Sequence, residues 1–344
     1  MNDSSNPLAA FRCYRIHSET SLSETDTKTI SGRLETNSID QIDAGQLVVR
    51  VAYSSVNYKD ALAATGKGKI IRDFPLIGGI DLAGTVHVSK DDRFKPGDEV
   101  IVTGNGIGER FDGGYTEFCR VEGDWTVSLP DGMDLYTSMA LGTAGFTAAQ
   151  AIHRLEHNGL TPDDGEVLVT GATGGVGSFA INMLSQRGYA VAALTGKLDQ
   201  AGALKRLGAT NVISRHDLEM GTKPLERAQY AAAIDNAGGQ ILSWLTRVIK
   251  PRGGIASIGM AGGAELTSTV MPFILRGINL FGIASSSAPM DERKIVWDRL
   301  ASDLRPRDLH AIVTETIQLD QLQSTFDAMM AGTHVGRTVV AVGS

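Results

Sequence analysis

The chain has 344 residues, with 32 lysines and arginines against 39 aspartates and glutamates and a formal net charge of −7. That length is more than one compact core usually holds, so two domains are expected, and the mildly acidic balance gives no sign of nucleic-acid binding. Cys13 and Cys119 are its two cysteines, too few for a disulfide framework or a four-thiolate zinc site. Residues 1–6 are polar, and no apolar stretch is long enough to span a bilayer. We therefore expect a cytoplasmic protein without a nucleic-acid or membrane partner.

The first part of the chain is rich in β-branched and apolar runs that predict strands. A short loop over residues 54–62 is expected to turn into a helix, and residues 135–150, beyond Pro130, have a helical, small-residue pattern. The predicted strands cover residues 45–53, 79–88, 95–102 and 113–121.

The next predicted strand covers residues 166–170, and a glycine-rich stretch follows it. A helix is predicted to resume at Ser178 and to stop at Gly188. Strand, glycine turn and helix together place backbone N–H groups and a positive helix end against a pyrophosphate. The dinucleotide fingerprint is met with Ala172 in its first place; Gly174 would let the backbone approach the phosphates, and Gly177 would let the helix lie close on the strand.

The end of the second predicted parallel strand, residues 189–195, indicates which dinucleotide is bound. Proteins that bind NAD usually carry Asp or Glu there to hold the ribose hydroxyls. This chain has Thr195, Gly196 and Lys197, and a hydroxyl and an ammonium attract a 2′-phosphate that a carboxylate would repel. Asp199 lies beyond the strand and is interpreted as the start of the next helix. The sequence therefore predicts NADPH rather than NADH.

From this point strands alternate with helices, which predicts a doubly wound parallel sheet. The further strands are predicted at residues 209–214, 231–235, 254–259 and 278–283. A helix is predicted over residues 291–304. The tail, residues 336–342, is a strand with no helix after it, so it is expected to rejoin the N-terminal β-rich part.

Six sequence blocks carry a resemblance to a known family. They are residues 54–62 (SSVNYKDAL), 65–71 (TGKGKII), 78–84 (GGIDLAG), 141–147 (LGTAGFT), 170–177 (TGATGGVG) and 270–276 (VMPFILR). Together they resemble the acryloyl-CoA reductase family (AcuI/YhdH type), a quinone-oxidoreductase-like branch of the medium-chain dehydrogenase/reductase superfamily. The similarity runs from about Val48 to the C-terminus.

The resemblance implies an α/β fold in which a Rossmann doubly wound parallel sheet domain is inserted in a GroES-like β-rich catalytic domain. The expected division is residues 1–139 for the first part of the catalytic domain, 140–284 for the NADPH-binding domain and 285–344 for the return to the catalytic domain.

Zinc-dependent members of the superfamily hold their metal with a thiolate, an imidazole and usually a carboxylate. Where they carry the cysteine this chain has Tyr58 or Lys59, and where they carry a Gly-His-Glu run it has Gly-Ile-Asp at residues 79–81. His153 and His157 stand at helical spacing without a thiolate or carboxylate set, and we interpret both as facing solvent. No metal is expected.

Without a Lewis acid, hydride addition to an alkene conjugated to a carbonyl is easier than ketone reduction, because hydrogen bonds can stabilise the enolate. The resemblance implies reduction of acryloyl-CoA to propanoyl-CoA. Tyr58 is the candidate nearest the nicotinamide, to bind it or to help deliver the proton; the alternative is an aromatic residue that packs under the domain junction. Asn57 would orient the nicotinamide amide or the enolate, or is a helix cap. Asp60 and Asp81 are a possible acid/base pair, or a helix-start carboxylate and a strand residue with an internal partner, and neither is assigned a role.

The resemblance also implies a set of cofactor contacts. Met260, Ile274 and Ser285 lie at or after strand ends, where ligands bind in open α/β sheets, although each is otherwise a core or loop residue. Asp235, at the end of a strand, is interpreted as capping the turn that follows. The contacts to the pyrophosphate and 2′-phosphate are expected from Thr173, Gly174, Gly175, Val176 and Gly177, and from Thr195, Gly196, Lys197 and Arg215.

A coenzyme A thioester carries phosphates that attract cations. Lys67, Lys69 and Arg72 cluster beside the candidate site loop, and Arg276 and Arg337 are further candidates. The alternative is that these side chains are simply solvated.

Three functions follow from these features. The first is an NADPH-dependent acryloyl-CoA reductase, and the second is a quinone or enone reductase acting on small acceptors. The third belongs to another class, a non-catalytic NADPH-binding protein. Residues 278–283 would leave an exposed sheet edge, and the resemblance implies a homodimer that pairs such edges.

Overall fold

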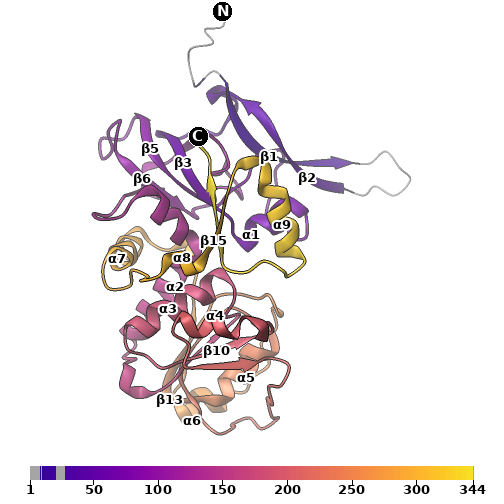
Figure 1. Cartoon of the computed structure of the whole chain (residues 1–344), viewed down its shortest axis with the longest axis vertical. Helices are drawn as coiled ribbons and strands as arrows, with labels where there is room; N and C mark the ends of the chain where they lie inside the picture. The colour runs from indigo at the N-terminus through magenta and orange to yellow at the C-terminus, as the bar shows by residue number, and fades with distance from the viewer. Residues whose placement is uncertain (1–7, 9, 21–27, 344) are drawn as a thin grey trace, which may run out of the picture. The chain divides into compact units, whose positions relative to one another are not determined.

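The structure, a computed structural model of the chain, describes residue 8, residues 10–20 and residues 28–343 (Figure 1). The polar N-terminal stretch discussed above lies outside these residues. The chain forms two compact units. The first unit comprises Met1–Thr143, Ser286–Lys294 and Val313–Ser344, and the second comprises Ala144–Ser285 and Ile295–Ile312. The domain division expected from the sequence stays a prediction.

The first unit is built mainly from strands, which agrees with the β-branched runs of its sequence. Its elements are β1 (Phe11–Thr20), β2 (Lys28–Asn37), β3 (Leu47–Ser55), α1 (Tyr58–Thr65), β4 (Leu76–Ile77), β5 (Asp81–Ser89), β6 (Glu99–Thr103), β7 (Phe118–Val121), β8 (Val127–Ser128), β15 (Val313–Ile317), α9 (Leu322–Met330) and β16 (Arg337–Ala341). Two further helices, α2 (Leu135–His157) and α7 (Met290–Ala301), begin in this unit and continue into the second.

Two sheets organise the first unit. The larger runs in the order β15-β16-β3-β5-β6-β8, with β7 also paired to β3, and the smaller runs β2-β1-β4. The C-terminal strand β16 pairs antiparallel with β3, so the prediction that the tail returns to the N-terminal β-rich part is confirmed.

The larger of two apolar clusters in the described part of this unit lies between these strands and the helices α1 and α9. Leu47, Val49 and Leu82 reach it from the sheet, and Ala61 of α1 and Phe326 of α9 reach it from the helices. The two helices lie side by side (Figure 1). Because both bury their apolar faces in the same core, their positions are fixed against each other.

The second unit alternates strands and helices as the sequence predicts. Its elements are β9 (Val167–Thr170), α3 (Gly175–Gln186), β10 (Val191–Thr195), α4 (Ala201–Arg206), β11 (Asn211–Ser214), β12 (Tyr230–Asp235), α5 (Gly239–Val248), β13 (Ile249–Ser257), α6 (Met271–Arg276), β14 (Asn279–Gly282) and α8 (Leu309–Ile312).

All the strands of this six-stranded sheet are parallel, in the order β11-β10-β9-β12-β13-β14. β9 and β12 are neighbours although two strands separate them in the sequence, so the strand order reverses between them. In open sheets of this kind the ligand binds at that point, beyond the carboxyl ends of the strands. The predicted doubly wound parallel sheet is therefore confirmed, and its topology marks the place for a dinucleotide.

Candidate functional site

The predicted glycine loop joins β9 to α3. Gly171 has a φ of +58°, and Gly174 is the N-terminal cap of the helix, which begins at Gly175, three residues earlier than the sequence predicts. A β-carbon on Gly177 would lie 2.4 Å from the carbonyl oxygen of Gly171. Only glycine therefore allows α3 to pack this closely, as predicted. The first intrahelical bond runs from Ser178 N–H to Gly174, so the N–H groups of Gly175, Val176 and Gly177 have no intrahelical acceptor and can donate to an anion.

The four residues expected to hold a 2′-phosphate lie together beyond the ends of β10 and β11. The backbone N–H of Arg215 donates to the carbonyl of Thr195 over 2.9 Å, and the N–H of Lys197 donates to the Thr195 hydroxyl over 3.0 Å. A β-carbon on Gly196 would lie 2.8 Å from Nε of Arg215, so the guanidinium passes directly over that glycine. Partial burial lowers the pKa of Lys197, and Asp199 opposes that shift.

Asp235 ends β12 and caps the turn after it, as the sequence predicts. Its carboxylate accepts hydrogen bonds from the Thr170 hydroxyl, at 2.7 Å, and from the N–H of Gly238, at 2.9 Å. Burial raises the pKa of this carboxyl group. The neighbouring Asn236 donates its amide to the carbonyl of Thr170 over 2.8 Å, whereas its buried amide oxygen has no partner among the described residues. That oxygen lies at the β9–β12 reversal, and sequence reasoning gave it no function.

The three other residues predicted to contact the cofactor, Met260, Ser285 and Ile274, differ in their surroundings. The backbone of Met260 lies against the Gly238 turn, since a β-carbon on Gly238 would be 3.0 Å from the Met260 Cα, and its side chain is 71% exposed. The Ser285 hydroxyl accepts a hydrogen bond from Thr147 over 2.7 Å. Ile274 stands on α6 and is 72% exposed, and no contact within the described part of the chain joins it to the glycine loop.

In the first unit, the two predicted catalytic residues begin α1. Asn57 is its N-terminal cap and forms a capping box with Asp60, whose carboxylate accepts the Asn57 N–H over 2.8 Å. Asn57 is 8% exposed and Tyr58 is 52% exposed. The cap interpretation of Asn57 is therefore confirmed. A tyrosine this exposed is not a core packing residue of its unit, and its catalytic role stays a prediction.

Asp81 holds Asn57 from the first residue of β5. Its carboxylate accepts hydrogen bonds from the Asn57 amide, at 2.8 Å, and from the backbone N–H of Thr143, at 2.9 Å. The hydroxyls of Ser55 and Thr143 also donate to it. The sequence-based alternative of a strand residue with internal partners is the one that the structure shows.

Arg337, on β16, supplies the buried positive charge beside these carboxylates. It donates to the Asn57 amide oxygen over 3.0 Å, to the Val56 carbonyl over 2.8 Å and to the Ala140 carbonyl over 3.2 Å. Its complete burial lowers its pKa, and Asp81 and Asp60 raise it. Arg337 is therefore not a surface cation for coenzyme A, and that expectation is wrong. Arg276 is also occupied, because it donates to the backbone carbonyls of Arg247, Ile249 and Glu226.

Burial, followed by the charge of Asp81, raises the pKa of Asp60 to about 7. Its second oxygen accepts the N–H of Ile80 over 3.0 Å. Both Asp60 and Asp81 are buried and bonded inward, so the structure gives them a structural part at the start of α1 rather than an exposed acid/base pair.

Gly142 allows this network to close. It interrupts α2 with φ 48° and ψ −154°, a conformation that favours glycine. A β-carbon there would lie 2.6 Å from side-chain atoms of Arg337, Asp81 and Ser55. Residues 135–150 were predicted as helical without a break at Gly142, and a glycine inside that helical pattern was the signal available in the sequence.

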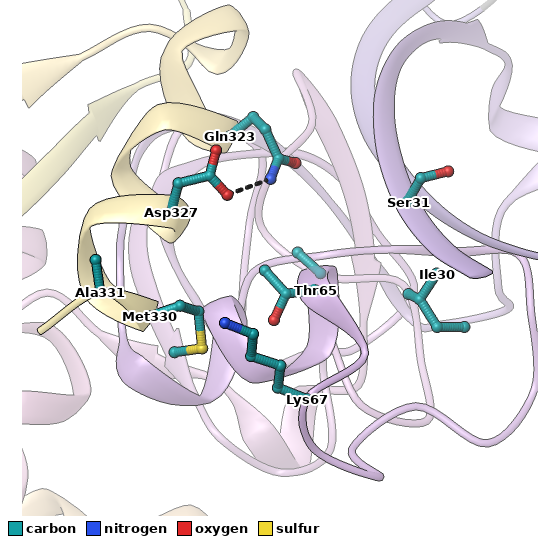
Figure 2. Close-up of a pocket in the computed structure, with 9 residues that line it drawn as sticks. Ile30, Ser31, Thr65, Lys67, Gln323, Asp327, Met330 and Ala331 are labelled. Atoms are coloured by element: carbon teal, nitrogen blue, oxygen red, sulfur yellow. Dashed lines mark hydrogen bonds between the residues drawn. The ribbon is translucent and has the colours of Figure 1, made fainter. Parts of the chain in front are cut away.

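A cavity of about 520 Å³ lies between α1, α9 and β2 (Figure 2). Lys67 lines it, together with Thr65, Gln323, Asp327 and Met330. Lys69 and Arg72 are exposed and do not line it. The structure therefore separates the predicted cationic cluster: one lysine faces a cavity, and the other two side chains face solvent.

Within the described ranges, no group of three or more His, Cys, Asp or Glu side chains is placed to hold a metal ion. Cys13 and Cys119 are buried, and burial raises the pKa of the Cys13 thiol to about 12. His157 is exposed, as predicted, and His153 is half-buried near Arg299. None of the helices that the structure describes combines the length and apolar character needed to cross a bilayer.

A β-rich unit joined to a doubly wound parallel sheet with a glycine-rich first turn defines a medium-chain dehydrogenase/reductase. Two family models match the chain accordingly, the alcohol dehydrogenase GroES-like domain over residues 43–131 and the zinc-binding dehydrogenase domain over residues 175–302. The predicted fold class is therefore confirmed.

Individual relatives narrow the class. "Putative quinone oxidoreductase YhfP" of Bacillus subtilis is 46% identical, over 92% of this chain and 96% of the relative. Acrylyl-CoA reductase AcuI of Ruegeria pomeroyi is 44% identical, over 89% of this chain and 93% of the relative.

Solved structures agree with these sequence relatives. The YhdH oxidoreductase of Salmonella enterica in complex with NADP superimposes with a TM-score of 0.91 and 43% identity, over 96% of this chain and all of the other. B. subtilis yhfP with NAD bound gives a TM-score of 0.92 and 44% identity, over 97% and 99% of the two chains.

The chain belongs to the quinone-oxidoreductase-like family of AcuI, YhdH and YhfP within the medium-chain dehydrogenase/reductase superfamily. It is an oxidoreductase that depends on a nicotinamide dinucleotide. The third sequence-based alternative, a binding protein without turnover, is not supported by this membership.

Proposed function

We propose that this oxidoreductase uses NADPH to reduce an alkene conjugated to a carbonyl group, and that its substrate is acryloyl-CoA, reduced to propanoyl-CoA. The observation that carries the proposal is the similarity to acrylyl-CoA reductase AcuI along 89% of the chain. The cavity beside α1 supports a substrate larger than a simple enone.

The choice of NADPH depends on the chain's own side chains, because similar structures are solved with NADP and with NAD bound. We assign the pyrophosphate to the loop Thr173, Gly174, Gly175, Val176 and Gly177, where the N–H groups at the start of α3 are available. Thr195, Gly196, Lys197 and Arg215 are assigned to the 2′-phosphate. Lys197 and Arg215 lie together at one strand edge, with no carboxylate at the end of β10 itself. A cationic pair of this kind favours the phosphorylated dinucleotide.

Met260, Ile274 and Ser285 remain proposed cofactor contacts. Met260 is the best supported of the three, because its backbone packs on the turn at the strand reversal. Ile274 is exposed, and its proposed contact with the cofactor depends on the family resemblance alone.

When bound, NADPH supplies the hydride that the β-carbon of the substrate receives, and the α-carbon takes a proton. Negative charge develops on the thioester oxygen, which a hydrogen-bond donor stabilises. We propose that Tyr58 contacts the nicotinamide and that its exposed phenol donates to the substrate. Asn57 is proposed to orient the nicotinamide amide or the enolate. Asp81 and Arg337 hold its side chain in a fixed orientation.

Zinc independence is part of the proposal. Where zinc enzymes of the superfamily carry a Gly-His-Glu run, this chain has Asp81 with its oxygens engaged by Ser55, Asn57 and Thr143. A carboxylate with its lone pairs used in this way is a poor metal ligand. The measurement is the zinc content of the purified protein, and one bound zinc ion per chain would contradict the proposal.

A quinone or small-enone reductase is the second candidate, favoured by the similarity to a protein named as a quinone oxidoreductase. One experiment separates the two: NADPH absorbance is followed with acryloyl-CoA, crotonyl-CoA and a simple quinone in parallel. The proposal predicts the highest kcat/KM for acryloyl-CoA. Turnover of the quinone without turnover of either thioester would assign the second function.

We also propose that the protein is cytoplasmic and forms a homodimer through the edge of its parallel sheet. β14 is the last strand of that sheet in the described part of the chain, and the adjoining α6 exposes Ile274 and Leu275. An unpaired edge beside exposed apolar side chains favours association. Gel filtration at low concentration is expected to give the dimer mass, and a monomer would contradict this part of the proposal.

A further inference from the structure

The cavity beside α1 combines apolar and polar walls within the first unit. Figure 2 shows Lys67, two residues beyond the end of α1, and Asp327 from α9 facing the same space, with Ile30 of β2 on the other side. Met330 adds a second apolar wall. No part of the substrate has yet been assigned to this cavity, and its volume of about 520 Å³ is in the range of small-molecule sites.

The polar side chains of the cavity have defined hydrogen-bonding capacity. Gln323 is fixed at both ends, since its amide oxygen accepts from Tyr14 over 2.8 Å and its amide nitrogen donates to Asp327 over 3.0 Å. Asp327 keeps acceptor capacity for an N–H group. In the described contacts, Lys67 and Asp327 form no ion pair with each other. The Asp327 carboxylate in the wall disfavours a polyphosphate inside the cavity and favours a neutral ligand segment with amide N–H groups. Lys67 favours a negative charge at one end of such a ligand.

Helix α1 connects this cavity to the proposed reaction site. Tyr58 and Thr65 are the first and last residues of the helix, seven positions apart, which places them on one face almost two turns from each other. Seven residues of α-helix span about 10 Å. Tyr58 is exposed at one end of that face, and Thr65 lines the cavity at the other.

We propose that the cavity beside α1 binds the amide-bearing pantetheine arm of the acyl-CoA substrate, with Lys67 taking the phosphate that follows the arm. This inference depends on the proposed function, because it assumes that the acryloyl end lies at Tyr58. The arm has about 13 bonds between the thioester sulfur and the first phosphorus, and at the extension per bond of a polypeptide it spans about 15 Å. A thioester at Tyr58 therefore brings its amides to Thr65 and its phosphate to Lys67, two residues further on.

The test compares four proteins: wild type, Lys67→Gln, Lys69→Gln and Ala331→Phe. Lys69→Gln is the matched control, since it removes the same charge two residues away, outside the cavity. Ala331 lines the cavity and is exposed, so a phenylalanine there fills space without disturbing the core. KM and kcat are measured with acryloyl-CoA and with acryloyl-pantetheine, which lacks the phosphate, and KM is measured for NADPH.

Lys67→Gln is expected to raise KM for acryloyl-CoA by about 3- to 10-fold, the effect of one partly exposed charge-assisted contact, and to leave KM for acryloyl-pantetheine unchanged. Ala331→Phe is expected to raise KM for both thioesters, and Lys69→Gln for neither. KM for NADPH stays constant in all four. The cavity assignment alone is overturned if the wild type reduces acryloyl-CoA but Lys67→Gln and Ala331→Phe have the same KM values as Lys69→Gln. The proposed function then stands. A wild type inactive on acryloyl-CoA overturns the proposed function and this assignment with it.

Discussion

Replacing Arg337 by methionine tests the buried network at the start of α1 most severely. Methionine has similar length and no charge, so the change leaves the Asn57 amide oxygen and the carbonyls of Val56 and Ala140 without their donor. It also leaves Asp81 without the positive charge beside it. Breaking one side of a buried charge pair costs about 3–5 kcal/mol of unfolding free energy, and we expect a loss in this range at pH 8.

The loss is expected to depend on pH, and Asp60 determines its direction. The pKa of this carboxyl is raised from its ordinary 3.8 to about 7 in the folded protein, so the folded state binds a proton more tightly than the unfolded chain between these values. Stability from this group is therefore highest at low pH and falls as pH rises through that window. Removing Arg337 raises the folded pKa further, so Arg337→Met loses less stability at pH 5 than at pH 8, by about 1 kcal/mol or more.

The assay is urea unfolding at pH 5 and pH 8, compared with Arg50→Met as the control. Arg50 is an exposed arginine on β3, and its replacement is expected to change stability by less than about 0.5 kcal/mol at either pH. A loss below about 1 kcal/mol for Arg337→Met, or the same loss at both pH values, would contradict the stabilising role given to Arg337 beside Asp60 and Asp81.

Three further predictions follow from the two units. Gly142→Ala is expected to lower the free energy of unfolding by about 2–4 kcal/mol, because its β-carbon would enter the buried network at a positive φ. Thermal unfolding measures the loss, and an unchanged Tm would show that the network accommodates the methyl group. Lys197→Ala and Arg215→Ala are each expected to raise the Kd for NADPH about 10-fold while the Kd for NADH stays constant, and equal effects on both dinucleotides in a fluorescence titration would remove the 2′-phosphate assignment. Tyr58→Phe is expected to lower kcat with acryloyl-CoA about 10- to 100-fold at an unchanged Kd for NADPH, and full activity would exclude proton delivery by the phenol.

The features that could be predicted from the sequence are those encoded by neighbouring residues. The strand, glycine turn and helix around Gly174 and Gly177 form a continuous pattern, and the structure has that arrangement. The same holds for Thr195 and Lys197 at the end of β10, and for Asp235, whose turn follows it directly in the chain.

The features that could not be predicted depend on contacts between distant residues. Arg337 and Asn57 are 280 positions apart, and nothing local distinguishes a buried arginine in a β-branched strand from a surface cation. The cavity is likewise formed by three separate segments, β2, the end of α1 and α9. Of these only α1 was predicted. β2 lacks a regular apolar alternation and is stabilised by the core that it shares with α1, whereas Leu322, Phe326 and Met330 of α9 do follow a helical spacing that could have predicted this helix.

The most direct test of the central claim is to locate the transferred hydride. Acryloyl-CoA is incubated with the enzyme and NADPH that carries deuterium at the transferable position of the nicotinamide, and the product is analysed by mass spectrometry and NMR. Hydride transfer to the conjugated alkene predicts propanoyl-CoA with one deuterium on the β-carbon and a solvent-derived proton on the α-carbon. Propanoyl-CoA with deuterium on the α-carbon, or no propanoyl-CoA at all, would contradict it.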